Sequence, residues 1–370
     1  MLVPRYGYPA QFDDLPALTD RISELLLSGD YILGRPVERF EHAFAERLGA
    51  GAAVGVNSGT DALVLALHAL GIGPGDEVVT VANTFHSTVL AIVRVGAVPV
   101  LVDCTGTDYM TDLDQLEAAI TPRTRGIIAV HMFGQVLDMD RIGALAARHG
   151  LALVEDCAQA VGAEWNGRAA GTFGDIGCFS FHPSKTLGAA GDAGAAITGR
   201  PELADRLRLL RGLGQREQNR HEEAGYSSRM DSVQALVLEH KLPRLDEWNR
   251  ARRAVADRCD RALAGSPVRV PEAGPGHVYH MYQVIVPDRD VTLAALRAAG
   301  IDAVVRYPVP IPLQPAFAAY GFDPEAYPNA RFLAENALCL PLRPEMTPEE
   351  TDLMTGALLS VVAPNRGAHA

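Results

Sequence analysis

Long apolar runs and an excess of basic charge are both missing from this sequence of 370 residues. No stretch reaches the length of a membrane span. The start of the chain shows no basic segment followed by an apolar one, so we predict no signal peptide. The formal net charge is −12, and such a surface repels the phosphates of nucleic acids and of anionic lipids. The sequence therefore predicts neither a nucleic acid nor a membrane as a general partner.

Paired cysteines are missing as well. The cysteines are odd in number, lack CxxC spacing and are scattered along the chain at Cys104, Cys157, Cys178, Cys259 and Cys339. This pattern is typical of reduced cytosolic thiols, and it argues against both a zinc site and a disulfide framework. We therefore expect a cytoplasmic protein with no metal site.

Lysine is nearly absent, although arginine is common. Only Lys185 and Lys241 occur among 33 basic side chains. Lys185 lies in an apolar, glycine-rich loop, whereas Lys241 is predicted to lie on a solvated helix face. A desolvated lysine, unlike arginine, can lose its proton and act as a nucleophilic amine. Lys185 is therefore the candidate for amine chemistry, and an ordinary surface lysine is the simpler alternative.

Alternating strand and helix patterns between about residues 52 and 198 predict an α/β domain with a mainly parallel sheet. Runs rich in valine and isoleucine, apolar at consecutive positions, fit strands that are buried on both faces. Between them, amphipathic patterns predict helices, one of which ends at Gly71 and another of which spans Asp138 to Gly150. The predicted strands are Glu77–Val81, Val98–Val102, Gly126–His131, Leu151–Glu155, Ile176–Ser180 and Gly194–Thr198.

Helical patterns dominate from Pro201 to about residue 255, and a smaller α+β domain is predicted after them. That domain is expected to hold a strand at 280–286 and helices at 291–299 and 347–361. We place the boundary within a helix near Asp246, which gives a large domain of residues 1–245 and a small C-terminal domain of residues 246–370. The N-terminal segment 1–30 is a candidate to pack on the small domain, and the tail 365–370 is expected to fray.

Two further stretches bear on function. The first runs from a strand pattern through Ser58, Gly59 and Thr60 into a helix, whose N-terminus is a natural phosphate site. Ser58 could equally be a simple helix cap. The second is the strand that ends at Asp156, because ligands in open α/β sheets bind beyond the carboxyl ends of strands. A helix cap or a loop salt bridge is the alternative for Asp156.

These two stretches and Lys185 together match the needs of pyridoxal phosphate. The lysine attaches the cofactor covalently, the carboxylate pairs with its protonated ring nitrogen, and the helix N-terminus holds its phosphate. The combination is far more specific than any one of the three.

Eight stretches, in order across nearly the whole chain, carry a resemblance to a known family. They are GDYILG (29–34), VGVNSGTDALVLALHALGIGPGDEVVTVANTF (54–85), GAVPVLVD (96–103), AITPRTRGIIAVHMFG (119–134), VEDCAQAVGA (154–163), GDIGCFSFHPSKTLGAAGD (174–192), SRMDSVQA (228–235) and RYPVPIPLQPAF (306–317). On these stretches the chain resembles the DegT/DnrJ/EryC1/StrS sugar aminotransferases. The resemblance implies a fold type I pyridoxal-phosphate transferase, in which helices flank the mainly parallel mixed sheet of the large domain.

The resemblance also implies roles for individual residues. Lys185 matches the Schiff-base lysine, Asp156 matches the partner of the pyridinium nitrogen, and Gln159 matches the residue beside the ring hydroxyl. The other cofactor-binding positions are Ser58, Gly59 and Thr60 in the phosphate turn, Ser180 as a further phosphate contact, and Phe85 stacked on the ring.

The family works as a dimer with shared active sites, so the resemblance implies a homodimer. A neighbouring subunit commonly sends the asparagine of a Gly-x-Asn-x-Arg segment towards the phosphate, and Ser227 stands at that position here, before Arg229. The common Gly-Asp-Gly-Gly has Ala193 as its third residue. Arg306 and Pro312 replace both histidines of the common His-Tyr-Pro-x-Pro-x-His. These departures put the donor and acceptor in doubt more than the chemistry.

Four residues are candidates for contact with substrate. Acceptor specificity is expected in loops around Tyr31, Arg229 and Arg306, and His182 could hydrogen-bond cofactor or substrate. A structural salt bridge is favoured for Arg306 over a contact with a substrate carboxylate or phosphate.

The implied reaction moves an amino group from L-glutamate or L-glutamine to a keto sugar, with pyridoxamine phosphate formed during turnover. A nucleotide-linked 3-keto deoxysugar is favoured over a 4-keto one, and a keto-cyclitol is the alternative acceptor. The related sugar dehydratases carry histidine in place of the lysine, so Lys185 argues against that activity. The intact cofactor residues argue against a non-catalytic regulatory protein on this fold. The sequence has no GxGxxG after a strand, which argues against a nicotinamide oxidoreductase.

Overall fold

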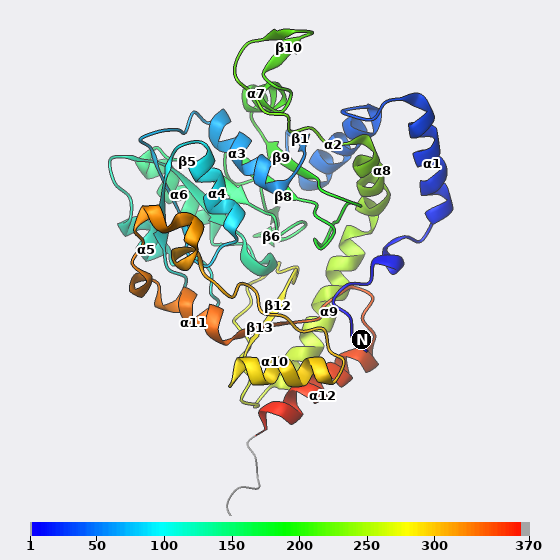
Figure 1. The fold of residues 1–370 in the computed structure, drawn as a ribbon, viewed down its shortest axis with the longest axis vertical. Helices are drawn as coiled ribbons and strands as arrows, with labels where there is room; N and C mark the ends of the chain where they lie inside the picture. The colour runs from blue at the N-terminus through cyan, green and yellow to red at the C-terminus, as the bar shows by residue number, and fades with distance from the viewer. Residues whose placement is uncertain (1, 364–370) are drawn as a thin grey trace, which may run out of the picture.

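A seven-stranded mixed sheet organises the first two thirds of the chain in the computed structural model, which describes residues 2–363 (Figure 1). The strand order is β1-β9-β8-β5-β4-β2-β3, and only β9 runs antiparallel to its neighbours. The strands are β1 (Ala52–Val56), β2 (Glu77–Val81), β3 (Val98–Val102), β4 (Thr124–Val130), β5 (Ala152–Asp156), β8 (Ile176–Ser180) and β9 (Gly194–Thr198). All six predicted strands are confirmed, with ends that move by at most two residues.

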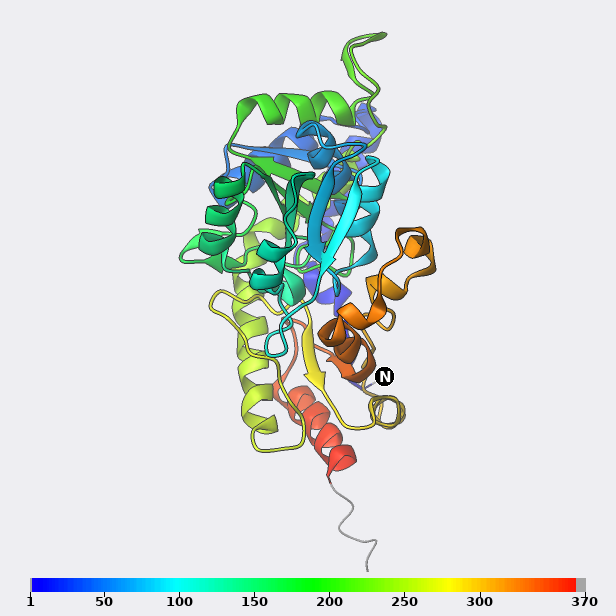
Figure 2. The same ribbon diagram turned by 90° about the vertical axis from the view of Figure 1, so that its left-hand side faces the viewer.

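Helices cover both faces of this sheet (Figure 2). They are α2 (Arg35–Leu48), α3 (Gly59–Ala69), α4 (His86–Arg94), α5 (Leu113–Ala118), α6 (Met139–His149), α7 (Pro201–Arg211) and α8 (Ser232–Lys241). The helix predicted from Asp138 to Gly150 is confirmed as α6. The Asp138 side chain caps it by accepting a hydrogen bond from the Arg141 N–H, and Gly150 ends it at a φ of 63°.

Two short ribbons leave the sheet. One pairs β6 (Glu164–Trp165) with β7 (Arg168–Ala169), and the other pairs β10 (Gln215–Glu217) with β11 (Arg220–His221). The second ribbon projects from one end of the molecule in both views (Figures 1 and 2). Short 3-10 helices lie at Tyr8–Gln11, Met132–Gly134, Leu242–Arg244, Ile311–Leu313, Pro315–Tyr320 and Pro324–Ala326.

The last third of the chain builds a second, smaller core below the sheet in Figure 1. Its elements are α9 (Leu245–Leu263), β12 (Tyr282–Ile285), α10 (Arg289–Ala298), α11 (Pro328–Asn336), β13 (Ala337–Leu340) and α12 (Pro348–Val362). The strand predicted at 280–286 and both predicted helices are present. Thr347 and Glu350 form a reciprocal capping box at the start of α12.

Helix α9 crosses the domain boundary predicted near residue 246. Its first turns bury Leu245 and Trp248 in the core beneath the sheet, and its later turns bury Val255 and Cys259 in the smaller core. A continuous helix therefore connects the two cores. The division into residues 1–245 and 246–370 stays a prediction.

The N-terminal segment contacts both parts of the molecule. Val3 is buried in the smaller core, and the N–H groups of Leu2 and Val3 donate to the Gly300 carbonyl. Further along, α1 (Leu15–Ser28) buries Leu18 and Leu25 against α8. The segment therefore passes from the small core to the large part of the chain.

Membrane spans, cysteines and the C-terminal tail were the subjects of three other predictions. Over residues 2–363, no helix combines the length and apolar character that a membrane crossing requires. All five cysteines are buried and free. The fraying expected at residues 365–370 concerns positions outside the described residues.

Candidate active site

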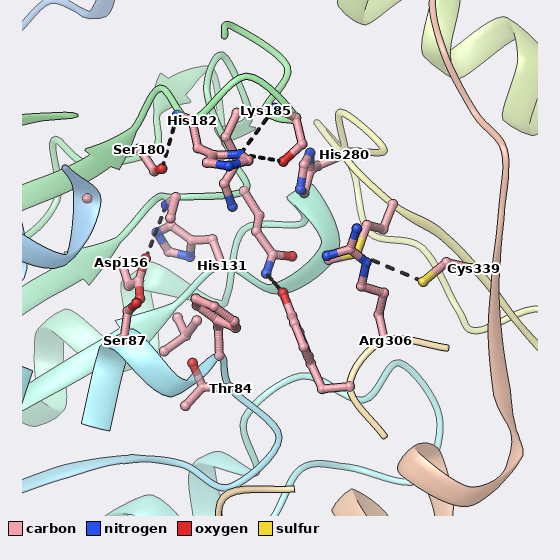
Figure 3. A pocket seen from close by; sticks show the side chains of 18 of the residues that line it. Thr84, Ser87, His131, Asp156, Ser180, His182, Lys185, His280, Arg306 and Cys339 are labelled. Carbon is pink, nitrogen blue, oxygen red and sulfur yellow. Dashed lines mark hydrogen bonds between the residues drawn. The ribbon is translucent and has the colours of Figure 1, made fainter. Parts of the chain in front are cut away.

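A cavity of about 370 Å³ lies between the sheet and the small core. On the sheet side, its lining residues follow the carboxyl ends of β1, β2, β4, β5 and β8, which all lie at the same edge. The opposite wall comes from the C-terminal third of the chain, with Arg5 and Tyr6 from the N-terminal segment. In Figure 3, Asp156 and Ser180 lie on one side of the cavity, His280 and Arg306 lie on the other, and the Lys185 loop spans the gap. Ten predicted residues line it: Ser58, Gly59, Thr60, Phe85, Asp156, Gln159, Ser180, His182, Lys185 and Arg306.

The start of α3 forms one end of the cavity. The Ser58 side chain accepts a hydrogen bond from the Asp61 N–H at 3.1 Å, so the helix-cap reading of Ser58 is correct. Among the described residues, the N–H groups of Gly59 and Thr60 have no acceptor. These free donors at a helix N-terminus suit a phosphate group.

Two glycines allow the chain to close tightly around this turn. A Cβ at Gly59 would lie 2.7 Å from the Ser180 Cβ, and a Cβ at Gly194 would lie 2.4 Å from the Ser58 carbonyl carbon. Strands β8 and β9 can therefore touch the turn only because both positions lack a side chain. Gly194 is the fourth residue of the motif in which Ala193 replaces a glycine.

Asp156 ends β5 and is almost fully buried. Its carboxylate accepts hydrogen bonds from the Thr88 hydroxyl at 2.8 Å and from the Ala158 N–H at 3.1 Å. Burial raises the pKa of Asp156, whereas these hydrogen bonds and the charge of Lys185 favour the ionised form. A cation bound beside Asp156 would favour ionisation further.

Lys185 lies in the loop that follows β8. Burial lowers the pKa of its amine from 10.5 to about 8, and the positive charge of Arg306 lowers it too, against the opposing effect of Asp156. The Lys185 N–H donates to the His182 carbonyl at 2.8 Å, so the loop makes a tight turn at this residue. An amine with such a pKa is partly unprotonated near neutral pH and can take up or release a proton.

Aromatic and amide side chains form the walls beside Lys185. Phe85 is half exposed to the cavity, and its ring lies 5.3 Å from that of Tyr307. The Gln159 amide accepts from the Phe133 N–H at 2.7 Å and donates to the Tyr307 hydroxyl at 3.1 Å. These two bonds fix the amide with its nitrogen towards Tyr307, where burial raises the pKa of the phenol.

The other two predicted substrate residues in the cavity differ in their surroundings. The His182 ring is exposed, and its Nδ1 is 2.9 Å from the Ser184 hydroxyl. Arg306 donates to the Tyr6 hydroxyl at 3.3 Å and forms no ion pair with any residue of the range 2–363. The structural salt bridge favoured for Arg306 is therefore not found, and its guanidinium is available to an anionic group in the cavity.

Three predicted residues lie outside this cavity. Tyr31 is half exposed, and its hydroxyl donates to the Leu26 carbonyl at 2.8 Å. Ser227 is exposed, and Arg229 is partly exposed. The neighbouring Ser228 contacts the phosphate turn of its own chain, because its hydroxyl donates to the Asp61 carboxylate at 2.7 Å and accepts from the Asn57 N–H.

Lys241 corrects one sequence prediction. It was placed on a solvated helix face, yet only 2% of it is exposed. Its amine donates to the Gly188 carbonyl and to the Gln11 side chain, each at 2.9 Å. The helical pattern around residue 241 could not reveal this, because Gln11 is 230 positions away.

Several residues that build the site were not selected from the sequence. Thr88 holds the Asp156 carboxylate, and Tyr307 holds the Gln159 amide. Tyr307 belongs to the stretch RYPVPIPLQPAF, which was the available signal for it. Arg252 and His280 reach the cavity from the C-terminal third, and no local pattern marks either of them.

Hydrogen bonds within the protein hold the carboxylate of Glu155, the acid next to Asp156. Its carboxylate accepts three backbone N–H bonds at 2.7 Å, from Gly171, Phe173 and Gly174. It also lies 2.9 Å from the His131 ring. His131, Glu155 and Cys157 stand close enough to share a metal ion, but the hydrogen bonds already occupy both Glu155 oxygens.

These observations fit pyridoxal phosphate. The glycine-lined turn offers free N–H donors to a phosphate, the buried Asp156 needs a cationic partner, and Lys185 offers an amine of lowered pKa at the same cavity. An α/β fold with these groups at the carboxyl edge of its sheet defines the class of fold type I pyridoxal-phosphate enzymes.

Comparison with known proteins places the chain within this class. It belongs to the DegT/DnrJ/EryC1/StrS aminotransferase family, whose model matches residues 15–358. The dTDP-3-amino-3,4,6-trideoxy-alpha-D-glucose transaminase of Streptomyces venezuelae is 44% identical over 350 residues, which cover 93% of this chain and 92% of the relative. The UDP-N-acetyl-3-dehydro-alpha-D-glucosamine 3-aminotransferase of Acidithiobacillus ferrooxidans is 45% identical over 331 residues, or 89% of each chain.

The fold comparison agrees. The crystal structure of S. venezuelae DesV in complex with a ketimine intermediate superposes with a TM-score of 0.95 and 42% identity, covering 98% of this chain and 99% of DesV. Other similar structures are described as PLP or PMP forms. The chain is a pyridoxal-phosphate-dependent aminotransferase, as the sequence predicted.

Proposed function

We propose that this enzyme moves an amino group from L-glutamate or L-glutamine to a keto sugar carried on a nucleotide. The observation that carries the proposal is the meeting of Lys185, Asp156 and the phosphate turn at one cavity. Two relatives, at 44% and 45% identity, are named for nucleotide-linked amino or keto sugars, and both names specify position 3 of the sugar. They support a 3-keto deoxysugar over a 4-keto one.

The bound cofactor supplies an electron sink and a carrier for the amino group. Ser58, Gly59, Thr60 and Ser180 are proposed to hold its phosphate. We assign Phe85 to one face of its ring and Gln159 to its ring hydroxyl. These positions agree with the cavity walls described above.

Asp156 and Lys185 are proposed to perform the chemistry. Asp156 keeps a negative charge against the cofactor's ring nitrogen, and Thr88 orients that carboxylate. The Lys185 Nζ would accept the proton that leaves the α-carbon of the amino donor and would deliver a proton to the cofactor carbon that carries the amino group. A pKa of about 8 allows both steps near neutral pH.

We assign the opposite wall to substrate binding. Arg306 has no carboxylate partner within residues 2–363, so it can pair with an anionic group of a substrate. His182 lies at the exposed mouth of the Lys185 loop, where it can reach the acceptor.

Reduction of the holoenzyme with borohydride tests the role of Lys185. Purified protein with pyridoxal phosphate should be yellow, and reduction should fix the cofactor to the peptide that contains Lys185. The Lys185→Ala variant should be colourless and should lose transfer. A colourless Lys185→Ala protein that still transaminates at the wild-type rate would refute the assignment.

A half-reaction screen tests the substrate. The pyridoxamine form of the enzyme is mixed with dTDP- and UDP-linked 3-keto sugars, with 4-keto sugars and with a keto-cyclitol, and the return of the pyridoxal absorbance is followed. We expect return with a nucleotide-linked 3-keto sugar and little with the others. Return with the keto-cyclitol alone would favour the alternative acceptor.

We also propose a homodimer in which Tyr31, Ser227 and Arg229 serve the partner's site. All three lie outside the cavity of their own chain. Exposed apolar side chains occur close to Tyr31 in the sequence, at Leu26, Leu27 and Ile32, and also at Leu213. Backbone hydrogen bonds connect the segments that carry these residues. The Ser232 N–H donates to the Tyr31 carbonyl, and the Leu213 N–H donates to the Tyr226 carbonyl. A second copy would cover these apolar groups.

Complementation tests the shared sites. Lys185→Ala and Arg229→Ala proteins should each be inactive. An equimolar mixture that exchanges subunits should regain about a quarter of the activity, since about half of its dimers are mixed and each mixed dimer has one intact site of two. No recovery in verified mixed dimers would place Arg229 and Lys185 in the same subunit's site.

The five free, buried cysteines suit a reducing compartment, and we therefore propose a cytoplasmic location.

A further inference from the structure

Lys241 is a buried amine that the proposed chemistry does not use. It ends α8, and its amine makes two hydrogen bonds of 2.9 Å, to the Gly188 carbonyl and to the Gln11 side chain. The amine also lies 4.3 Å from the centre of the Phe12 ring. An apolar residue could fill the same space without the cost of burying an amine. The specific hydrogen bonds of Lys241 therefore indicate a role other than packing.

The first contact holds the loop that carries Lys185. The loop is closed by a hydrogen bond of 2.8 Å from the Ala189 N–H to the Phe181 carbonyl. A Cβ at Gly188 would lie only 2.6 Å from the Pro183 carbonyl oxygen, so the two sides of the loop touch each other. A shift at Gly188 would therefore move Lys185, three residues earlier.

The second contact holds the N-terminal segment of residues 4–12. At its other end, the Pro4 carbonyl accepts a hydrogen bond of 2.8 Å from Arg343. Between these two anchors, Arg5 and Tyr6 line the cavity, and Arg5 pairs with Asp302 at 3.2 Å. Gln11 therefore fixes the end of the segment that lies nearest to the Lys185 loop.

We propose that Lys241 is a positioning residue that ties the cavity wall at Arg5 and Tyr6 to the loop that carries Lys185. A single side chain then fixes both the position of the Lys185 amine and the position of the cavity wall opposite it. Burial lowers the pKa of Lys241 to about 8, and the nearby negative charge of Glu345 opposes that shift. The inference rests on the proposed role of Lys185.

Affinity for the two forms of the cofactor tests this inference. Pyridoxal phosphate bonds to Lys185, whereas pyridoxamine phosphate does not, so a misplaced Lys185 weakens the first form selectively. We expect Lys241→Met to raise the dissociation constant of pyridoxal phosphate about tenfold and that of pyridoxamine phosphate at most threefold. Calorimetric titration of cofactor-free protein gives both constants, and the pH at which the absorbance of the yellow holoenzyme changes should shift as well.

Two matched variants separate the two contacts. Arg343→Met frees the Pro4 end of the segment without touching Gly188, so it should raise the KM of the amino donor and leave the ratio of the two cofactor affinities unchanged. Gln11→Leu removes only the contact to the segment and should behave in the same way. Lys241→Gln keeps one possible donor and should shift the ratio less than Lys241→Met, and it carries the test if Lys241→Met fails to fold.

The inference is overturned if both cofactor affinities fall equally in the Lys241 variants, or if neither falls while only the thermal midpoint drops. It is also overturned if Arg343→Met changes the ratio as much as Lys241→Met does. Failure of the proposed function gives a different result, because wild-type protein itself would then carry no reducible cofactor at Lys185.

Discussion

The contact between Gly194 and the phosphate turn makes the Gly194→Ala variant informative. The added Cβ would lie 2.4 Å from the Ser58 carbonyl carbon, 2.5 Å from its oxygen and 2.7 Å from the Gly59 nitrogen. Ordinary contact begins at 3.4 Å, so the methyl group is one ångström too close to backbone that cannot rotate away. Overpacking of this kind costs about 1–3 kcal/mol.

The cost should appear mainly in cofactor binding. The turn can relieve the clash only by moving away from β9, and this movement carries the N–H groups of Gly59 and Thr60 with it. Since each 1.4 kcal/mol corresponds to about a tenfold change in an equilibrium constant, affinity for pyridoxamine phosphate should fall about fivefold to 140-fold. Calorimetric titration of the cofactor-free variant measures this loss directly.

A second glycine in the same region provides the control. Gly199 follows the end of β9, and a Cβ there meets nothing within 4 Å. Gly199→Ala should bind the cofactor as the wild type does and unfold at a similar temperature. If Gly194→Ala also binds pyridoxamine phosphate within twofold of the wild type, the tight approach of β9 to the turn is not needed for the phosphate site, and the reasoning fails.

Four further predictions concern charge, orientation, proton binding and helix stability. Asp156→Asn should slow the donor half-reaction at least about a hundredfold in stopped-flow absorbance, because a neutral amide stabilises the ring cation poorly; a rate within threefold of wild type would contradict the assigned role. Tyr307→Phe frees the Gln159 amide nitrogen, so the absorbance of the bound cofactor should change while the rate falls only a few-fold, and an unchanged spectrum would show that the amide is held without Tyr307. In cofactor-free protein, the pKa of Lys185 is about 8 when folded against 10.5 when unfolded. Between these values the unfolded chain binds more protons, so the stability of the wild type relative to Lys185→Met should rise with pH, by at most about 1.4 kcal/mol per pH unit. Urea unfolding at pH 7 and at pH 9.5 should show that the difference in unfolding free energy between the two proteins grows with pH. An equal difference at both pH values would refute the shift in the pKa of Lys185. Gly143→Ala in α6 adds a Cβ that meets nothing within 4 Å, and it should raise stability by about 0.5–1 kcal/mol in the same assay.

Local patterns were sufficient to predict the sheet and the groups at its carboxyl edge. Strands buried on both faces are continuous apolar runs, and the residues that end them must meet at one edge when the strands are parallel. Asp156, Ser180 and Lys185 could therefore be placed together from the sequence alone. The glycine at 194 needed the structure, because its partner Ser58 is distant in the sequence.

Contacts between remote segments were beyond such patterns. Lys241 was predicted to be exposed because a helix of mixed polarity gives no sign of a segment that covers it from residues 11 and 12. The wall formed by Arg5, His280 and Arg306 depends on how three separate segments pack, and only Arg306 was marked, by its departure from the family motif. The roles proposed for Tyr31, Ser227 and Arg229 involve a second chain, which no local pattern describes.

The rarity of lysine has a practical consequence for chemical labelling. Lys241 is enclosed, so Lys185 is the only lysine side chain of this protein that a reagent can approach, and it must do so through the cavity. Acylating dyes and amine cross-linkers decorate the outside of most proteins at many points. Here they would react with the α-amino group and with Lys185, so the labelling of Lys185 would report whether the cavity is open or filled. An ordinary labelling reaction, read at the peptide that contains Lys185, thus becomes a footprint of a single side chain.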